Sequence, residues 1–367
     1  MNAPVLLVMA GGTGGHIFPA LAVAQELAAA GWRIVWLGQR NGMEARIVPE
    51  HGLEMAWIDA RPLRGRGLLE KLLLPCHLLI AVAQAIRVLQ RVRPSVVLGM
   101  GGYVSAPGGL VAAALRRPLV LHEQNSVAGL ANRLLARLAS RLYSGFPDVL
   151  PRAQWVGNPV RRDIAALPPP AERYGARSGP LKLLVLGGSQ GARALNDAVP
   201  GALARLPQNL RPEMLHQTGA SDVDAVRKRY AALAIEADVR AFIVDMSASY
   251  GAADLVICRA GALTIAELAA AGVASILVPY PHAVDDHQTG NARFLADHGA
   301  AILLPQLPAD DRPESSLEAR LATWLMELLI EPARTRLAAM ADAARRLARP
   351  DAAAAVAAGC RALVEAP

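Results

Sequence analysis

Apolar residues follow two patterns along this chain, and the two patterns alternate. Short, nearly continuous apolar runs such as residues 4–10 and 33–37 predict buried parallel strands, because both faces of such strands are covered. Between the runs, apolar residues recur every three or four positions, which is typical of amphipathic helices. The first helix is expected from about Pro19 to Ala30, with Gly31 closing it. This alternation predicts parallel sheets covered by helices on both faces.

The alternation occurs twice. In the first half, further strands are expected at residues 96–98, 119–122 and 141–144. Residues 167–170 and 175–180 have the composition of a linker, and the pattern then restarts. Strands of the second series are expected at residues 181–186, 214–217, 239–242, 255–258, 275–278 and 301–304. An Ala-rich helical tail from about Pro332 is broken at Pro350.

We therefore predict an α/β fold of two Rossmann-like parallel-sheet domains that face each other across a cleft. The first is expected over residues 1–160 and the second over residues 161–334. A C-terminal helix of about residues 335–367 is expected to pack back on the first domain.

Composition excludes several other classes of protein. Apolar residues make up 53% of the chain and charged residues 19%, which excludes a disordered protein. Cys76, Cys258 and Cys360 are too far apart to suggest a disulfide framework or a zinc site, so a reduced, intracellular protein is expected. The first apolar run is too short for a signal peptide, and residues 72–86 fall short of the ~20 residues that cross a bilayer.

The basic residues are concentrated in the first half. Residues 1–160 carry 16 Lys and Arg against 8 Asp and Glu, a net +8, whereas residues 161–367 carry 22 against 23. An anionic surface is therefore expected as a partner of the first half. Nucleic acid is the weaker candidate and anionic lipid the stronger one, because the arginines are not interleaved with aromatic residues and no nucleic-acid-binding motif occurs.

Two glycine turns occupy corresponding places in the two series, Gly11–Gly15 and Gly187–Gly191. Each follows a predicted strand and opens a predicted helix, where backbone amides can bind phosphate. A single such turn could be an ordinary tight turn, but two alike favour a diphosphate site. Neither turn completes a dinucleotide fingerprint, since Ile17 stands where the third glycine would be, and no Walker lysine is present. No nicotinamide or other cofactor and no ATP hydrolysis are expected.

Several polar residues stand where predicted strands end. His16 is a candidate for a general base or a phosphate ligand, and residues 122–125 place four polar side chains directly after an apolar run. Arg161 is either a phosphate contact or a solvated charge, and Glu267 either binds the ribose hydroxyls or complements a helix dipole. Asp222 and Asp224 are interpreted as helix-capping residues, so no metal site is expected.

Taken together, these stretches resemble the MurG-type UDP-N-acetylglucosamine transferases of bacterial cell-wall synthesis. The resemblance rests on seven motifs in order, namely residues 11–16, 99–105, 122–125, 157–161, 187–192, 259–267 and 282–288. It implies the GT-B fold and transfer of N-acetylglucosamine from UDP-N-acetylglucosamine to O4 of the N-acetylmuramic acid of lipid I. The product would be lipid II, formed with inversion at the anomeric carbon.

The resemblance also implies roles for individual residues. His16 is the candidate catalytic base, and Thr13, Gly14 and Gly15 would line the diphosphate side and the acceptor pocket. Glu267 would hold the ribose and Ile243 would touch the uracil. The other residues expected to contact the UDP-sugar are Asn125, Arg161, Ser189, Ala262, Leu263, Thr264, Ile265, Ala266 and Gln288.

A membrane-facing patch is a further implication. Residues 72–74 and 78–80 are apolar, and Arg61, Arg64, Arg66 and Lys71 precede or flank them. They resemble the family's hydrophobic and basic patch, which would place the protein on the cytoplasmic face of the inner membrane as a peripheral protein bound to anionic lipid. The alternative is a core helix with solvated arginines.

Three other functions are compatible with parts of this pattern. A GT-B transferase could act on another acceptor, such as a diacylglycerol or a natural product. A nucleotide-sugar epimerase on the same fold would turn over the UDP-sugar without an acceptor. A nucleic-acid-binding module would need only the basic half and would leave the motifs after residue 180 unexplained.

Overall fold

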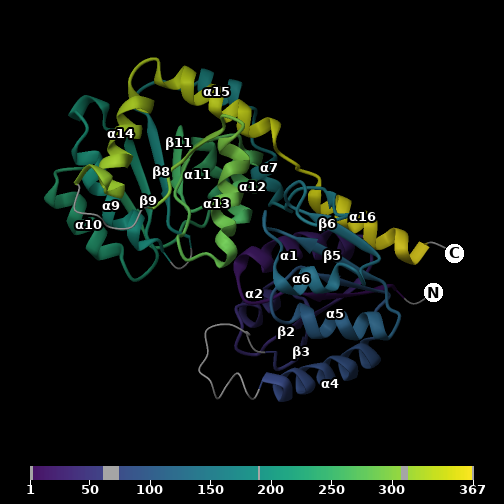
Figure 1. Ribbon diagram of the computed structural model, residues 1–367. Coiled ribbons are helices and arrows are strands. Elements are labelled where there is room, and N and C mark those ends of the chain that lie inside the picture. Colours follow the sequence, from purple (N-terminus) through teal and green to yellow (C-terminus); the bar gives the residue numbers. More distant parts are fainter. Residues whose placement is uncertain (1–2, 61–73, 189–190, 307–312, 366–367) are drawn as a thin grey trace. The chain divides into compact units, whose positions relative to one another are not determined.

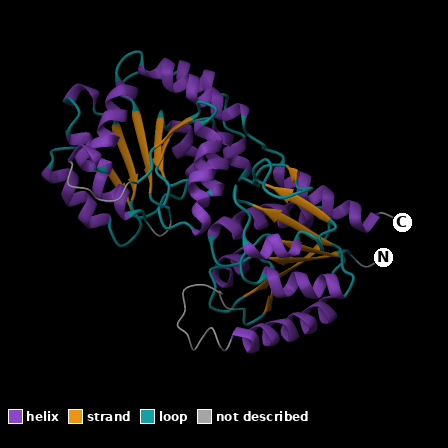
Figure 2. Ribbon diagram, in the orientation of Figure 1, coloured by secondary structure: helices purple, strands orange, loops and turns teal. Residues whose placement is uncertain are grey.

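The computed structural model describes residues 3–60, 74–188, 191–306 and 313–365. The chain divides into two compact units, which are described separately. Unit 1 comprises Met1–Val160 and Arg349–Pro367, and unit 2 comprises Arg161–Ala348. In each unit the strands form a parallel sheet with helices packed against it (Figure 2), so the prediction of two Rossmann-like parallel-sheet domains is confirmed.

The sheet of unit 1 has the strand order β3-β2-β1-β4-β5-β6-β7, and every pair is parallel. The strands are β1 (Val5–Met9), β2 (Arg33–Gly38), β3 (Glu54–Trp57), β4 (Val96–Gly99), β5 (Leu119–Glu123), β6 (Arg141–Ser144) and β7 (Gln154–Trp155). The helices are α1 (Gly14–Ala29), α2 (Glu44–Glu50), α4 (Leu74–Val92), α5 (Ser105–Ala114), α6 (Leu130–Leu135) and α16 (Ala352–Glu365). Strand order reverses between β1 and β4, which is where ligands bind in doubly wound sheets.

Successive side chains of β1 point to opposite faces of the sheet, as in any strand, and so pack in two different hydrophobic cores. Leu6 and Val8 pack in one cluster with α1 and α16, whereas Leu7 and Met9 pack in another with α4, α5 and α6. Figure 1 shows these helices around the sheet of unit 1. Both faces of the sheet are therefore covered, and its ligand-binding edge is the one at the carboxyl ends of the strands.

Unit 2 repeats this topology with the strand order β10-β9-β8-β11-β12-β13, again all parallel. The strands are β8 (Lys182–Leu186), β9 (Glu213–Gln217), β10 (Asp238–Arg240), β11 (Leu255–Cys258), β12 (Ala274–Leu277) and β13 (Ala301–Leu303). The α-helices are α7 (Arg162–Ala165), α8 (Pro170–Gly175), α9 (Arg193–Ala204), α10 (Val223–Ala232), α11 (Met246–Ala252), α12 (Ala262–Ala271), α13 (His287–Ala296), α14 (Leu317–Leu329) and α15 (Ala333–Arg346). Its strand order reverses between β8 and β11.

Most strand boundaries differ from the prediction by one or two residues, and the start of the first helix differs by more. The first helix begins at Gly14 rather than near Pro19, because the amides of His16 and Ile17 already donate to the carbonyl oxygen of Thr13 at 3.1 and 3.2 Å. Pro19 therefore lies inside α1 rather than at its start. His16 consequently lies in the first turn of α1.

A short helix that the sequence did not predict lies between the two predicted linker segments, residues 167–170 and 175–180, and includes their inner ends. It is α8, whose Arg173 and Tyr174 are buried in unit 2. The guanidinium of Arg173 donates to the carbonyl oxygens of Ala271 and Gly272 at the end of α12, where a helix leaves carbonyl groups unpaired. A Pro- and Ala-rich composition therefore conceals a helix that packs on the domain.

The C-terminal tail is shared between the two units. Leu337, Met340 and Ala341 of α15 pack in the core of unit 2, whereas Val356 and Cys360 of α16 pack in unit 1. Of the helix expected from about residue 335 on the first domain, only α16 lies there, and the chain leaves its helical path near Pro350 between α15 and α16. Within the described ranges, none of the helices is both long enough and apolar enough to cross a bilayer.

Candidate functional site

The first glycine turn connects β1 to α1 and is supported from behind by a buried carboxylate. Glu44 is 0% exposed, and its Oε2 accepts the amide of Gly12 at 3.2 Å while its Oε1 accepts the amide of Gln39 at 3.0 Å. A Cβ on Gly11 would lie 2.7 Å from Oε1 of Glu44. The absence of side chains in the turn thus lets this carboxylate approach the backbone closely.

A second glycine turn, after β4, lies against the first. Gly102 has φ +82, and a Cβ there would overlap the carbonyl oxygen of Gly11. Buried Ser105 donates from Oγ to the carbonyl oxygens of Met9 at 3.0 Å and Gly101 at 2.7 Å. The two turns therefore meet where the strand order reverses.

His16 faces this point of contact. Its Nδ1 lies 3.2 Å from the carbonyl oxygen of Gly11 and 3.4 Å from Oγ1 of Thr13. Since a carbonyl oxygen can only accept, Nδ1 carries the proton and Nε2 is the basic nitrogen. A Cβ on Gly101 would lie 3.0 Å from Nε2 of His16 and 3.4 Å from Oε1 of Gln124, so the basic nitrogen and this amide oxygen lie on the same side of Gly101.

Residues 122–125 are mostly paired with neighbours in unit 1. Oε2 of Glu123 accepts the amide of Gly129 at 3.0 Å and Nδ2 of Asn132 at 2.8 Å. Nε2 of His122 donates to the carbonyl oxygen of Gly157 at 2.9 Å, and burial lowers the pKa of His122, so its ring is neutral. His122 and Glu123 end β5 rather than follow it, and they position the loop that carries Asn125.

Gln124 differs from its neighbours. Its Nε2 lies 3.1 Å from Nδ1 of His122, which accepts because Nε2 of that ring is the donor. Its Oε1 is buried and has no hydrogen-bond partner among the described residues. Asn125 is half-buried, and its backbone amide donates to Oε1 of Glu123 at 3.0 Å. The loop after β5 therefore holds an unused acceptor beside His16.

In unit 2, the glycine turn after β8 has the same place in the sheet. Gly191 has φ +77, and a Cβ there would overlap the carbonyl oxygen of Thr218. Asn196 of α9 donates to that same oxygen at 3.0 Å and to Oδ2 of Asp222 at 2.8 Å. Asp222 thus joins a structural network. Ser189, an expected UDP-sugar contact, lies outside the described residues.

Glu267 is the sixth residue of α12. Oη of Tyr250 donates to Oε2 of Glu267 at 3.1 Å. Burial raises the pKa of the Glu267 carboxyl to about 7, although Tyr250 and the positive charge of Arg161 favour its ionised form. The position lies beyond the first turn, where a helix dipole acts most strongly, so tertiary contacts place this carboxylate.

Arg161 lies close enough to Glu267 to influence its pKa. It is half-exposed and forms an ion pair with Asp163, with Nη2 and Oδ2 2.6 Å apart. The hydrogen bond to Asp163 raises the pKa of Arg161. Unit 2 therefore brings two of the expected UDP-sugar contacts, Arg161 and Glu267, into one charged cluster.

The start of α12 presents part of the expected segment. Leu263, Thr264 and Ala266 are half-buried, whereas the side chains of Ala262 and Ile265 are buried in the core. The first amides of a helix have no acceptor within that helix. For Ala262 and Ile265 only backbone groups remain to contact a ligand.

Two other residues expected to contact the UDP-sugar have side chains that are taken up by the fold itself. Oε1 of Gln288 accepts the amides of Ala260 at 3.2 Å and Tyr280 at 2.9 Å, which ties together the loops after β11 and β12. Ile243 is 2% exposed, whereas its neighbours Phe242 and Val244 are 59% and 81% exposed. Any contact of Ile243 with a ligand is therefore limited to its backbone.

Glu44, Tyr103 and Tyr250 were not among the expected site residues. Tyr103 has its ring against the first glycine turn, where a Cβ on Gly12 would lie 3.1 Å from its Cε1. Gly101 and Gly102 immediately before it are the signal that could have identified Tyr103. Nothing in the local sequence marks Glu44 as buried, since acidic residues at helix starts are usually solvated.

Comparison with known proteins assigns the chain to a family. Residues 6–144 match the glycosyltransferase family 28 N-terminal domain, and residues 182–355 match the glycosyltransferase family 28 C-terminal domain. The chain is 60% identical over 360 residues to a UDP-N-acetylglucosamine--N-acetylmuramyl-(pentapeptide) pyrophosphoryl-undecaprenol N-acetylglucosamine transferase of Azoarcus sp. (strain BH72), covering 98% of each protein. It is 61% identical over 358 residues to a protein of the same name from Aromatoleum aromaticum, covering 98% of this chain and 97% of the relative.

A solved structure extends the similarity to three dimensions. The crystal structure of Acinetobacter baumannii MurG matches with a TM-score of 0.84 and 39% sequence identity, covering 98% of this chain and 99% of that one. The GT-B fold expected from the sequence is thereby confirmed. The chain belongs to the MurG family, within glycosyltransferase family 28.

Proposed function

We propose that this protein transfers N-acetylglucosamine from UDP-N-acetylglucosamine to O4 of the N-acetylmuramic acid of lipid I, forming lipid II with inversion. The observation that carries the proposal is 60% identity, over 98% of the chain, to a transferase whose name states this donor and this acceptor. The glycine turn at the strand-order reversal of each unit supports it, because such turns suit diphosphate groups and both substrates contain one.

An inverting transfer needs a base on the acceptor side. Nε2 of His16 takes the proton from the O4 hydroxyl while O4 attacks the anomeric carbon and the bond from that carbon to UDP breaks. In the neutral ring, the carbonyl oxygen of Gly11 holds the proton on Nδ1 and leaves the lone pair on Nε2. Thr13, Gly14 and Gly15 line the diphosphate side and the acceptor pocket beside it.

The departing UDP needs stabilisation of its growing negative charge. The amides at the start of α12 and the guanidinium of Arg161 serve this need, together with Ser189 in the glycine turn that follows β8. Asn125 and Gln288 complete the contacts to the UDP-sugar. No metal ion is required by this scheme, because helix dipoles and Arg161 supply the positive charge.

The nucleoside end of the donor binds in unit 2. Glu267 accepts hydrogen bonds from the ribose hydroxyls, and Ile243 contacts the uracil through its backbone. Residues 262–266 form the wall between these groups and the sugar. Unit 2 is thus the domain for UDP-N-acetylglucosamine, and unit 1 is the domain for the acceptor and the membrane.

The protein acts as a peripheral protein on the cytoplasmic face of the inner membrane. Leu78, Leu79 and Ile80 of α4 are exposed, which supports an apolar contact with lipid. The α4 helix (Leu74–Val92) runs without a break past Pro75. Arg61, Arg64, Arg66, Lys71 and residues 72–73 lie outside the described residues, and of Leu74 only the backbone is described.

Anionic lipid, rather than nucleic acid, is the partner of the basic first half. Each basic residue near an anionic bilayer contributes about 1 kcal/mol, and residues 1–160 carry a net +8, from 16 basic and 8 acidic residues. Apolar insertion and electrostatic attraction together give reversible docking, which suits an enzyme whose acceptor is anchored in the bilayer.

The first experiment is to measure UDP release from UDP-N-acetylglucosamine with and without a lipid I analogue. We expect release that depends on the acceptor and a β-linked disaccharide product. Release without acceptor would instead indicate an epimerase or a hydrolase. No turnover of the donor under either condition would contradict the proposed function.

A further inference from the structure

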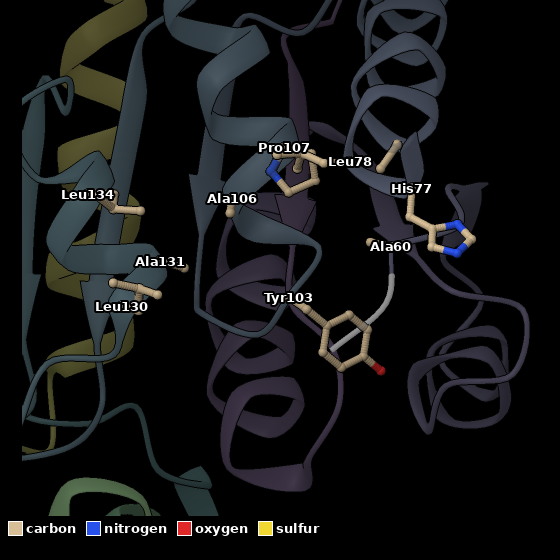
Figure 3. Close-up of a pocket in the computed structure, with 10 residues that line it drawn as sticks. Ala60, His77, Leu78, Tyr103, Ala106, Pro107, Leu130, Ala131 and Leu134 are labelled. Carbon is tan, nitrogen blue, oxygen red and sulfur yellow. The ribbon is translucent and has the colours of Figure 1, made fainter. Parts of the chain in front are cut away.

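Unit 1 contains an apolar pocket that the proposed catalytic scheme does not use. Its cavity volume is about 100 Å³, which is room for a short stretch of hydrocarbon chain, and the surrounding hollow is partly open to solvent. Figure 3 shows that its walls come from three helices, with Leu78 on α4, Pro107 on α5, and Leu130 and Leu134 on α6. The described wall residues include no Arg, Lys, Asp or Glu, so the pocket suits hydrocarbon rather than a phosphate or a sugar.

The apolar side chains at this pocket are unusually exposed. Leu134 is 62% exposed, and Leu130 and Leu78 are also exposed. Leu130 and Leu134 are four residues apart, so they lie on the same side of α6. Single exposed leucines are common, but a group of them around one pocket marks a site that an apolar ligand covers.

One end of the pocket reaches the candidate acceptor site. Tyr103 lines the pocket, and its ring also packs against the first glycine turn at Gly12. Figure 3 shows Tyr103 beneath α5, apart from the leucines of α6. A molecule with a diphosphate at the glycine turn would therefore have the pocket next to it.

The α6 wall is tied to the same site. Oε2 of Glu123 accepts the amide of Gly129, directly before α6, and Nδ2 of Asn132 within α6. Glu123 ends β5 and also holds the amide of Asn125. The wall that carries Leu130 and Leu134 is thus fixed by the residues that position the loop after β5.

We propose that this pocket receives the first part of the polyprenyl chain of a lipid-linked acceptor whose diphosphate lies at the first glycine turn. The inference rests on the proposed function, because that function supplies an acceptor with a hydrocarbon chain next to a diphosphate. The pocket selects acceptors by their chain, and it is distinct from the exposed residues Leu79 and Ile80, which do not line it.

The test compares two soluble acceptors, one lipid I analogue with several prenyl units and one with a single short alkyl group. Ala131→Trp fills the pocket from α6, and Leu134→Gln makes its wall polar at an exposed position that the fold tolerates. We expect each variant to raise the KM for the long-chain analogue about tenfold, as loss of part of a buried apolar contact would. The KM for the short analogue and kcat should change less than about twofold.

Leu115→Gln is the matched control, since Leu115 is an exposed leucine at the end of α5 and lies outside the pocket. It should leave both KM values unchanged in the absence of membranes. Two results would overturn the proposal while leaving the proposed function intact. One is an equal change in KM for the two acceptors in the pocket variants, and the other is a wild-type KM that is the same for both acceptors.

Two further outcomes distinguish a different occupant of the pocket from a different activity of the protein. Weaker binding of Ala131→Trp to acceptor-free vesicles of anionic phospholipid, with an unchanged KM for the long-chain analogue, would identify a membrane acyl chain as the occupant and overturn the proposal. If the unsubstituted protein turned over neither analogue, the proposed function would fail, and the assignment of the pocket would fail with it.

Discussion

The carbonyl oxygen of Gly11 lies 3.2 Å from Nδ1 of His16 and selects the tautomer of that ring. The oxygen can only accept, so the proton resides on Nδ1 and the basic lone pair on Nε2. Gly11 is itself held in place by contact with Gly102 and Glu44. The two glycine turns therefore orient the side chain that a base-catalysed transfer requires.

Replacement of His16 by Ala should lower kcat strongly. General base catalysis typically contributes about 10²–10⁴-fold, and we expect a loss in that range. The KM for UDP-N-acetylglucosamine should stay nearly constant, because His16 lies in unit 1 and the donor is assigned to unit 2. Steady-state measurement of UDP release with a lipid I analogue gives both values.

His51→Ala is the control for this variant, since His51 is an exposed histidine directly after α2. It should keep wild-type kcat. A His16→Ala protein with nearly unchanged kcat would mean that another group removes the proton.

The affinity for the donor should depend on pH through Glu267. In the proposed ribose site, its carboxyl group binds the two ribose hydroxyls more strongly when ionised, because both oxygens then act as acceptors, and burial raises its pKa to about 7. The KM for UDP-N-acetylglucosamine should therefore be lowest above pH 7 and should rise as the pH falls through 7. Tyr250→Phe removes a hydrogen bond that favours the ionised form, so it should move this rise to higher pH.

Glu267→Gln provides the comparison for the pH profile. It should raise the KM and remove its pH dependence near neutrality, because no titrating carboxyl remains at the site. A wild-type profile that is flat around pH 7, or one that Glu267→Gln leaves unaltered, would assign the ribose contact elsewhere.

The contact between the two glycine turns should be intolerant of even one methyl group. Gly102→Ala places a Cβ on the carbonyl oxygen of Gly11 in a residue with φ +82. Gly31 has nearly the same φ, +83, but has nothing within 4 Å of its Cβ position. The cost of Gly31→Ala should thus be only the backbone term of about 1 kcal/mol.

Comparison of these two alanine variants separates the steric effect from the backbone effect. Gly102→Ala should lose more stability in chemical denaturation than Gly31→Ala, and it alone should lose kcat. Equal losses in the two variants would show that the turns are not in close contact.

The buried carboxylate behind the first turn should contribute to both stability and activity. Glu44→Gln replaces one acceptor oxygen by an NH2 group that would face the amide of Gly12 or Gln39. Leaving a buried donor unsatisfied costs about 1–3 kcal/mol, which should lower the denaturation midpoint. The kcat should fall as the turn shifts.

Glu50→Gln is the matched control, because Glu50 is an exposed residue of the same helix. It should leave the midpoint and the activity unchanged. A Glu44→Gln protein as stable and active as this control would refute the supporting role of Glu44.

The sequence predicted the sheets better than the details of the sites. Buried parallel strands are continuous apolar runs, so residues 141–144 and 255–258 were located to the residue. Strand β3 was missed because Glu54 interrupts its apolar run at the sheet edge. The helix α8 was missed because its stability comes from Arg173 and from carbonyl groups about 100 residues away in the chain.

Site residues could be predicted where local sequence features mark them. Glycine turns and their following helices are local features, so the sequence alone could propose His16 and residues 262–267 as site residues. The roles of Glu44 and Tyr250 depend on contacts across 32 and 17 residues, which no local pattern encodes. Gln288 was found by its motif, but its hydrogen bonds to Ala260 and Tyr280 appear only in three dimensions.

Binding to membranes should depend on the exposed start of α4. Leu79 is 69% exposed and makes little contact with the core, so Leu79→Gln should leave stability unchanged. It removes apolar surface that would enter the bilayer, and we expect about tenfold weaker binding to anionic vesicles in sedimentation assays. Added salt should weaken the binding of the wild-type protein as well, because it screens the attraction of basic residues to anionic lipid.

Ile330→Gln, a change at an exposed residue of unit 2, should bind like the wild type. If Leu79→Gln also bound like the wild type, the start of α4 would not be the membrane contact, and the basic residues of the first half would have to account for docking alone.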